Sequence, residues 1–191
     1  YAGFIEKKQL TSTFNAATHI VTAQRSHVYR DATMKSPILM TLGMGAQVSV
    51  VEIGDKFAKL DDGRFIFKDH IAALSAREDF IDAAMRLLET PYVWGGRSGL
   101  GTDCSGLVQL ALERAGHNVA RDTEDQEKSI GVDATDKARQ RGDIVFFPGH
   151  VGIMVDDRNM LHANATHMKT VVEPLAEALK RSETITAIRR I

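Results

Sequence analysis

The sequence predicts an α+β fold preceded by a small all-β domain. Residues 18–74 contain short runs rich in β-branched and aromatic residues, separated by turn signals such as GMG at 43–45 and DDGR at 61–64. After residue 74, two segments place apolar residues at helical spacing. The rest of the chain returns to short apolar runs joined by turns. Helices followed by an antiparallel meander are typical of α+β proteins.

The all-β segment is expected to fold as a small barrel, because several short strands lie close together in the sequence. The expected strands are HIVTAQ, AQVSVVEI, FAKL and RFIF, at residues 19–24, 46–53, 57–60 and 64–67. Residues 2–10 are similar to residues 63–71, which close the barrel, with Phe4 aligned on Phe65. This similarity suggests that residues 1–17 are the remnant of a preceding barrel, and that a longer native chain precedes Tyr1.

Residues 75–191 make up the predicted α+β domain. A helix is expected to open at Ser75, with Glu78 at capping-box spacing, and to stop before Pro91. A glycine-rich loop follows, and a second helix is expected from Cys104 to a cap at Gly116. Strands are then expected at RGDIVFF, HVGIMV, NMLHAN, KTVVEP and ITAIRRI, with a short helix over residues 175–181.

Composition excludes some classes of function. The net charge of −1 provides no basic field that would attract nucleic acid or anionic lipid. No apolar run approaches the roughly 18 residues that a membrane span needs. The single cysteine forms no internal disulfide, so the fold does not require an oxidising compartment. The oligomeric state stays open.

That cysteine, Cys104, stands at the expected start of a helix, where unpaired amide groups and the helix dipole favour a thiolate. Asp103 is the expected N-cap. Cys104 also heads the apolar stripe of the helix, so a buried structural cysteine is an equal alternative from position alone.

A cysteine nucleophile needs a base and a group that orients the base. His150 opens one expected strand and His162 closes the next, with the turn residues DDRN between them. Folding about that turn brings the two histidines together. A structural zinc site needs four ligands, and no fourth is visible, so no metal or other cofactor is expected.

The motifs DCSGLVQ, GHVGI and LHA, in this order, resemble those of the NlpC-type family of papain-like bacterial cell-wall cysteine peptidases. The resemblance covers residues 75–191. It implies that Cys104 is the nucleophile, His150 the general base and His162 the orienting residue. It also implies that Tyr92 assists at the oxyanion beside the backbone N–H of Cys104; packing beside Trp94 is the alternative for Tyr92.

Residues 18–74 resemble the bacterial SH3-like barrels that often precede this peptidase. In one subgroup, tandem barrels close one end of the cleft, and the enzyme cleaves L-Ala-γ-D-Glu-diamino acid peptides that have a free amine. The residues beside the catalytic cysteine hold that amine there, and Asp103 and Ser105 occupy those positions here.

The resemblance implies a γ-D-glutamyl-L-diamino acid endopeptidase whose partners are peptidoglycan stem peptides. The alternatives are an N-acyl amidase or acyltransferase of the same fold, and a non-catalytic wall-binding module. A cytoplasmic location is expected if the substrate is recycled peptide, and a periplasmic or secreted one if it is intact wall.

Overall fold

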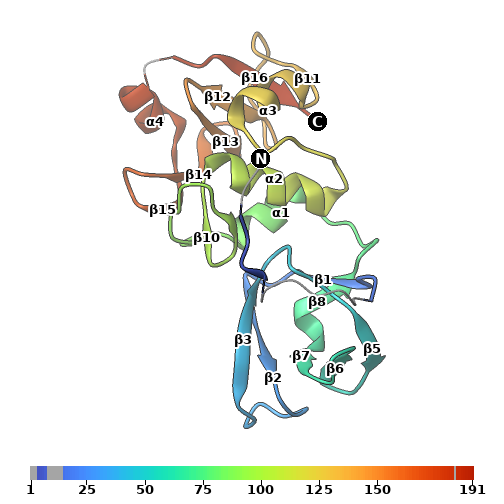
Figure 1. Cartoon of the computed structure of the whole chain (residues 1–191). Helices are drawn as coiled ribbons and strands as arrows, with labels where there is room; N and C mark the ends of the chain where they lie inside the picture. The colour runs from blue at the N-terminus through green and yellow to red at the C-terminus, as the bar shows by residue number, and fades with distance from the viewer. Residues whose placement is uncertain (1–3, 8–14, 183) are drawn as a thin grey trace.

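The computed structural model describes residues 4–7, 15–182 and 184–191, and it consists of an all-β part followed by a mixed part (Figure 1). The all-β part contains β1 (His19–Val21), β2 (Arg25–Tyr29), β3 (Ile38–Gly43), β4 (Gln47–Val48), β5 (Val50–Ile53), β6 (Phe57–Leu60), β7 (Phe65–Phe67), the 3₁₀ turn η2 (Lys68–His70) and β8 (Ile71–Ala73). The mixed part contains α1 (Phe80–Met85), β9 (Arg97–Ser98), β10 (Gly101–Thr102), α2 (Cys104–Ala115), α3 (Thr123–Ser129), β11 (Val132–Asp133), β12 (Ile144–Phe147), β13 (His150–Met154), β14 (Asn159–Asn164), β15 (Lys169–Pro174), α4 (Leu175–Ser182) and β16 (Ala187–Arg190). Helices on antiparallel strands are the organisation that the sequence predicts.

The all-β part is built from two antiparallel sheets. One has the strand order β3-β2-β7-β6-β5 and the other β4-β1-β8. A small apolar core joins them: Val21, Val28, Ala58, Leu60 and Ile66. Part of each of the four expected strands is present, whereas β2, β3 and β8 are strands that the sequence pattern does not predict. In β2, exposed and buried residues alternate, so the strand offers no apolar run to recognise.

The N-terminal segment tests the predicted similarity to residues 63–71 only in part. Residues 4–6 form neither helix nor strand, and the side chains of Phe4 and Ile5 are exposed. Their counterparts Phe65 and Ile66 lie in β7. The remainder of the segment, including Leu10, lies outside the described residues.

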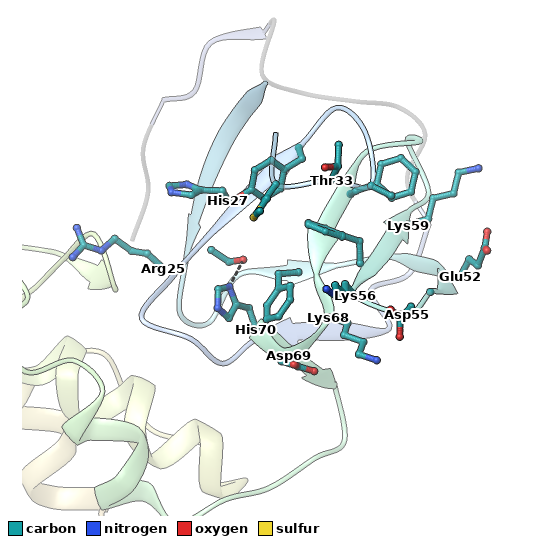
Figure 2. A pocket seen from close by; sticks show the side chains of 18 residues that line it. Arg25, His27, Thr33, Glu52, Asp55, Lys56, Lys59, Lys68, Asp69 and His70 are labelled. Atoms are coloured by element: carbon teal, nitrogen blue, oxygen red, sulfur yellow. Dashed lines mark hydrogen bonds between the residues drawn. The ribbon is translucent and has the colours of Figure 1, made fainter. Parts of the chain in front are cut away.

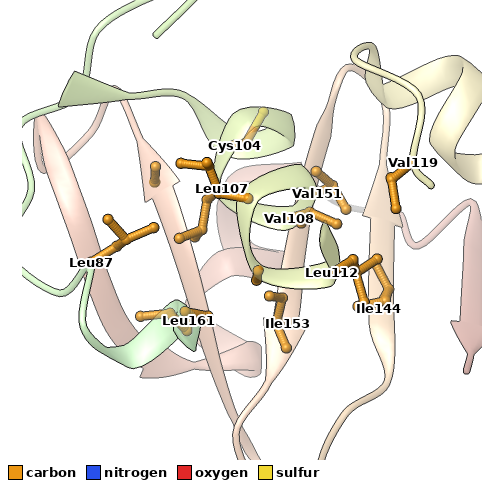
Figure 3. Close-up of a cluster of buried hydrophobic side chains, with 14 of the residues drawn as sticks. Leu87, Cys104, Leu107, Val108, Leu112, Val119, Ile144, Val151, Ile153 and Leu161 are labelled. Carbon is orange, nitrogen blue, oxygen red and sulfur yellow. The ribbon is translucent and has the colours of Figure 1, made fainter. Parts of the chain in front are cut away.

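The mixed part is a six-stranded antiparallel sheet with helices on both faces. The strand order is β11-β16-β12-β13-β14-β15. Helices α1 and α2 pack on one face, where Leu107, Val108 and Leu112 of α2 meet Val151 and Ile153 of β13 (Figure 3). Helix α4 packs on the other face, through Leu175 and Ala178. The sheet, α2 and α4 are therefore the elements that position the residues at the ends of β13 and β14.

The first helix is shorter than the sequence predicts. Asp79, and not Ser75, caps α1: its carboxylate accepts hydrogen bonds from the backbone of Ile81 at 2.8 Å and Asp82 at 3.0 Å. The predicted capping box fails because Glu78 has charged partners elsewhere, Arg86 at 2.5 Å and Arg114 at 2.8 Å. Two guanidinium groups hold a carboxylate more strongly than one backbone amide does.

The two parts contact each other next to the glycine-rich loop. Met44, on the loop after β3, is buried in the core formed by α1, α2 and the large sheet. The side chain of Gln24 donates to the Thr90 hydroxyl at 2.9 Å. Gly99 lies so close that a Cβ there would stand 1.6 Å from the carbonyl oxygen of Gln24. The all-β part thus supports the loop that leads to Cys104.

Among the described residues, no helix is long and apolar enough to cross a membrane.

Candidate active site

Cys104 is the first residue of α2, and its side chain points to the end of the large sheet where β13 begins (Figure 3). The residue is 8% exposed. Its sulfur lies 3.9 Å from the hydroxyl of Thr123. Cys104 belongs to the same buried cluster as Val151, the second residue of β13. The thiol is therefore buried beside the first residues of β13.

The Cys104 thiol differs from the expectation of a thiol acidified by the helix start. Burial raises its pKa, and the neighbouring Asp103 carboxylate raises it further. The hydrogen bonds from Thr123, Val151 and Ser105 lower the pKa but offset the rise only in part. The resting thiol is accordingly neutral and needs a base to become a nucleophile.

The two predicted histidines meet as the sequence suggests. The Nε2 atom of His150 lies 2.7 Å from Nδ1 of His162. A hairpin brings them together, because Asp156 accepts hydrogen bonds from the backbone of Arg158 at 2.7 Å and Asn159 at 2.6 Å and so closes the turn between β13 and β14. With Nε2 of His150 taken by His162, Nδ1 is the ring nitrogen left to accept a proton.

A small residue makes this pairing possible. The pairing of Ile153 with Leu161 places Gly152 opposite His162, with His150 diagonally beside it on the same face. A Cβ at Gly152 would lie 3.1 Å from Cβ of His162 and 2.5 Å from the sulfur of Met160. The glycine thus leaves room for the imidazole of His162.

Both imidazoles are held in the neutral form. Burial lowers the pKa of His150 to about 4, and the Arg181 guanidinium, together with any positive charge that His162 would take up, acts in the same direction. Burial also lowers the pKa of His162. A neutral imidazole is the form that can take up a proton, so the protonation state of His150 at neutral pH is compatible with a general base.

The hydrogen-bonded row continues beyond His162. Its Nε2 lies 2.7 Å from a carboxylate oxygen of Glu173 on β15. Arg181 of α4 forms an ion pair with the same oxygen. The pairing of Met160 with Glu173 places Glu173 on the sheet face that carries His162. Sequence reasoning missed both residues, because their position beside His162 depends on the order of the strands.

Tyr92 lies in the loop after α1 and is partly buried against the core that contains Cys104. Its amide donates to the carbonyl of Met168 at 2.9 Å. Burial raises the pKa of the Tyr92 phenol, and negative charge on Cys104 and Asp103 would raise it further. The phenol is therefore a neutral O–H donor close to the thiol, as an oxyanion donor must be.

Asp103 is the N-cap of α2 as predicted, and it has further partners. One carboxylate oxygen accepts from the amide of Gly106 at 2.8 Å. The other accepts from the amide of Gly95 at 2.8 Å and from Arg121 at 2.7 Å. Arg121 also donates to the hydroxyl of Ser105 at 2.8 Å. The structure brings Asp103 and Ser105 together, but it places a guanidinium where the sequence predicts a substrate amine.

Sequence reasoning assigned no role at this site to Thr123 and Arg121. Both lie within residues 121–123 (RDT), immediately before and at the start of α3. No periodicity distinguishes this stretch, and its position beside Cys104 depends on how α3 packs against α2. Among the described residues, no group of three His, Cys, Asp or Glu side chains is arranged to hold a metal ion.

A cavity of about 1110 Å³ lies in the all-β part (Figure 2). Tyr29, Phe57 and Phe67 line it, with edge-to-face ring contacts between Tyr29 and Phe57 and between Phe57 and Phe67. His70 on its wall is hydrogen-bonded to Ser26 at 2.9 Å. Its lining contains neither Cys104 nor His150, so the chemistry described above belongs to the mixed part.

Comparison with known proteins agrees with this geometry. The NlpC/P60 family model matches residues 89–189, the segment that contains Cys104, His150 and His162. The chain is 27% identical to dipeptidyl-peptidase 6 of Lysinibacillus sphaericus, over 100% of this chain and 80% of that protein. It is 29% identical to the gamma-D-glutamyl-L-lysine dipeptidyl-peptidase of Bacillus subtilis, over 100% of this chain and 69% of that protein.

A solved NlpC/P60 family structure from Bacillus cereus has the same fold. It matches with a TM-score of 0.75 at 22% identity, over 91% of this chain and 62% of that one. The chain therefore spans less than two thirds of that protein. Because the match covers 91% of this chain, it extends from the mixed part into the all-β part.

Proposed function

The chain belongs to the NlpC/P60 family, and we propose that it is a cysteine endopeptidase that hydrolyses the γ-D-glutamyl-L-diamino acid bond of peptidoglycan stem peptides. One observation carries the proposal: Cys104 begins α2 beside the start of β13, where His150 is hydrogen-bonded to His162 at 2.7 Å. The name of the Bacillus subtilis relative, a gamma-D-glutamyl-L-lysine dipeptidyl-peptidase, supports the choice of bond.

In the proposed mechanism, Nδ1 of His150 takes the proton of the Cys104 thiol as the sulfur attacks the γ-D-glutamyl carbonyl. The protonated His150 then gives this proton to the leaving amine of the diamino acid, and an acyl-thioester remains. Water attacks the thioester, again with His150 as base, and releases the acid and the free thiol. His162 orients His150 throughout.

The negative oxygen of each tetrahedral intermediate needs donors that are in place beforehand. The backbone N–H of Cys104, at the start of α2, is one proposed donor. The Tyr92 hydroxyl is the other, because it is a neutral phenol whose pKa burial and the nearby Cys104 and Asp103 keep high. Neither donor has to change its protonation state during the reaction.

We further propose that the all-β part is an SH3-like barrel and that Asp103 and Ser105 form the subsite for a free N-terminal L-Ala amine. A free amine is present on recycled stem peptides and not in intact wall, so the preferred compartment is the cytoplasm. The alternative is a periplasmic or secreted enzyme that acts on wall.

The test is hydrolysis of L-Ala-γ-D-Glu-L-Lys and its diaminopimelate counterpart, followed by mass spectrometry. The expected products are L-Ala-γ-D-Glu and the free diamino acid, with Cys104→Ala as the inactive control. Trapping the acyl-enzyme and weighing it separates this reaction from that of an amidase or acyltransferase, because the bound acyl group would differ. Failure of the wild type to cut either peptide would overturn the proposed substrate.

A further inference from the structure

A diagonal row of hydrogen-bonded side chains crosses three neighbouring strands. It begins at His150 on β13, passes through His162 on β14 and reaches Glu173 on β15. Both links measure 2.7 Å. The strand pairing places all three residues on the sheet face that α4 covers, and Arg181 of α4 forms an ion pair with Glu173 at the far end.

The protonation state of Glu173 decides which atom donates and which accepts in each hydrogen bond of the row. Burial raises the pKa of Glu173, but the hydrogen bonds from Arg181 and His162 and the charge of Arg181 outweigh it and keep this pKa below its usual value. The carboxylate is therefore ionised at neutral pH and only accepts hydrogen bonds. The atom facing it, Nε2 of His162, must then carry a hydrogen. Since His162 is neutral, its Nδ1 has none and accepts from the ring of His150.

A competing contact does not reverse this orientation. The side-chain nitrogen of Asn164 lies 3.0 Å from the same Nε2 atom of His162. An amide donor there would favour an unprotonated Nε2, but it would also leave two lone pairs facing each other at the shorter contact with Glu173. A charged acceptor at 2.7 Å outweighs a neutral donor at 3.0 Å.

We propose that Glu173 is a positioning residue: acting through His162, it fixes the tautomer of His150 that carries hydrogen on Nε2 and leaves Nδ1 free to take the proton of Cys104. This role rests on the proposed function of Cys104 and His150 as nucleophile and base. Two successive hydrogen bonds transmit the preference, in the way that a single carboxylate sets the tautomer of the histidine in a serine triad.

Charges around the row act in opposite directions. The carboxylate of Glu173 raises the pKa of both histidines, and Arg181 lowers both. His167, in the turn after β14, lowers that of His162, and His162 lowers that of His150. Removing the negative charge of Glu173 therefore makes His150 a weaker base, while removing the positive charge of Arg181 makes it a stronger one.

The test uses alkylation of Cys104 by iodoacetamide between pH 4 and 9, which requires no peptide substrate. Cys104 is the chain's single cysteine, so the gain in mass reports on this thiol alone. Glu173→Gln should react on the order of tenfold more slowly at pH 7, because a charge-assisted bond becomes a neutral one. Arg181→Met should move the acid limb of the rate profile to higher pH. The matched control is Glu177→Gln on α4, whose carboxylate pairs with Lys180 and not with a histidine.

Histidine ¹⁵N spectra give a readout that a merely structural role would not move. In the wild type, His150 and His162 should both carry hydrogen on Nε2, and in Glu173→Gln both should gain the Nδ1-protonated form. The proposal would be overturned if Cys104 of Glu173→Gln were alkylated at the wild-type rate. It would also be overturned if the variant reacted more slowly but kept the wild-type histidine tautomers and the wild-type acid limb of the rate profile. An enzyme that follows the expected alkylation pattern but cuts neither peptide would instead refute the substrate and leave the role of Glu173 standing.

Discussion

The guanidinium of Arg121 lies 2.7 Å from the carboxylate of Asp103. The amides of Gly95 and Gly106 and the hydroxyl of Ser105 also donate to this carboxylate, at 2.8, 2.8 and 3.4 Å. Four donors fill the roughly four acceptor sites of a carboxylate. A substrate ammonium at the proposed amine subsite must therefore share an oxygen with Arg121 or displace it.

This competition predicts how the preference for a free amine depends on Asp103. Acetylating the N-terminal L-Ala removes the ammonium, and charge-assisted bonds are worth about 1.5–3 kcal/mol, so the wild type should cut the free peptide roughly 10–100-fold better. Asp103→Asn keeps an N-cap but loses the charge, and it should reduce this ratio of kcat/KM. Arg121→Met removes the competitor and should increase it. Equal kcat/KM for the free and acetylated peptides in the wild type would rule out an amine subsite.

The proposed catalytic row predicts unequal effects of its members. Cys104→Ala and His150→Ala should each remove nearly all turnover, because nucleophile and base act as one unit. His162→Ala should retain more, since it only orients His150. Turnover of the L-Ala-γ-D-Glu-diamino acid peptide is the measurement, with circular dichroism as the control for folding. Near-wild-type turnover in Cys104→Ala would refute the mechanism.

The lowered pKa of His150 predicts a pH dependence of stability. The folded protein holds this imidazole neutral down to about pH 4, whereas the unfolded chain protonates it below about 6.5. Between these values the unfolded state binds more protons, so the free energy of unfolding falls as the pH drops from about 6.5 to 4. The full difference in the free energy of unfolding that protonation of His150 can cause is about 3 kcal/mol. This stability is fully present above the pKa of His150 in the unfolded chain, and it is lost as the pH falls towards the pKa in the folded protein.

Urea denaturation at pH 7 and pH 4.5 measures this loss. His150→Gln cannot take up a proton, so its stability should fall less than that of the wild type over the same interval. The matched control is His27→Gln, an exposed histidine on β2 that leaves the buried pair intact, and it should follow the wild type. If His150→Gln and the wild type lost the same free energy of unfolding between pH 7 and pH 4.5, His150 would not be held neutral in the folded protein.

The sequence was sufficient where local pattern determines structure. The start of α2 at Cys104, its cap at Asp103 and its end at Gly116 follow from capping chemistry and helical spacing. The meeting of His150 and His162 follows from one turn between two short strands. Each of these depends on residues that are near in the chain, so single-sequence reasoning reaches them.

The sequence was insufficient where a side chain contacts residues from distant segments of the chain. Glu78 fits a capping box until Arg86 and Arg114 take its carboxylate. The raised pKa of Cys104 comes first from burial, which depends on the packing of the whole domain. The position of Glu173 beside His162 depends on β15 pairing with β14. Tertiary contacts decide all three, and local spacing does not contain them.

The close contact between Gly99 and Gln24 predicts that the all-β part holds the glycine-rich loop in its position. A Cβ at residue 99 would stand 1.6 Å from the carbonyl of Gln24 and 3.2 Å from the amide of Met44, so the two parts must separate to accept it. Gly99→Ala should destabilise the protein by about 1–3 kcal/mol or more. It should also lower kcat/KM, because the displaced loop leads directly to Asp103 and Cys104.

Gly63→Ala is the matched control for this substitution. Gly63 has a φ of +86°, and no atom lies within 4 Å of the position that a Cβ would occupy. Alanine there meets backbone strain of about 1–2 kcal/mol but no steric conflict. Gly63 lies in the turn between β6 and β7, away from the loop, so its substitution should leave kcat/KM unchanged. The decisive comparison is activity at equal stability. If Gly99→Ala loses no more activity than Gly63→Ala once both are fully folded, the all-β part does not support the loop, and the close approach at Gly99 is a packing detail without consequence for the site.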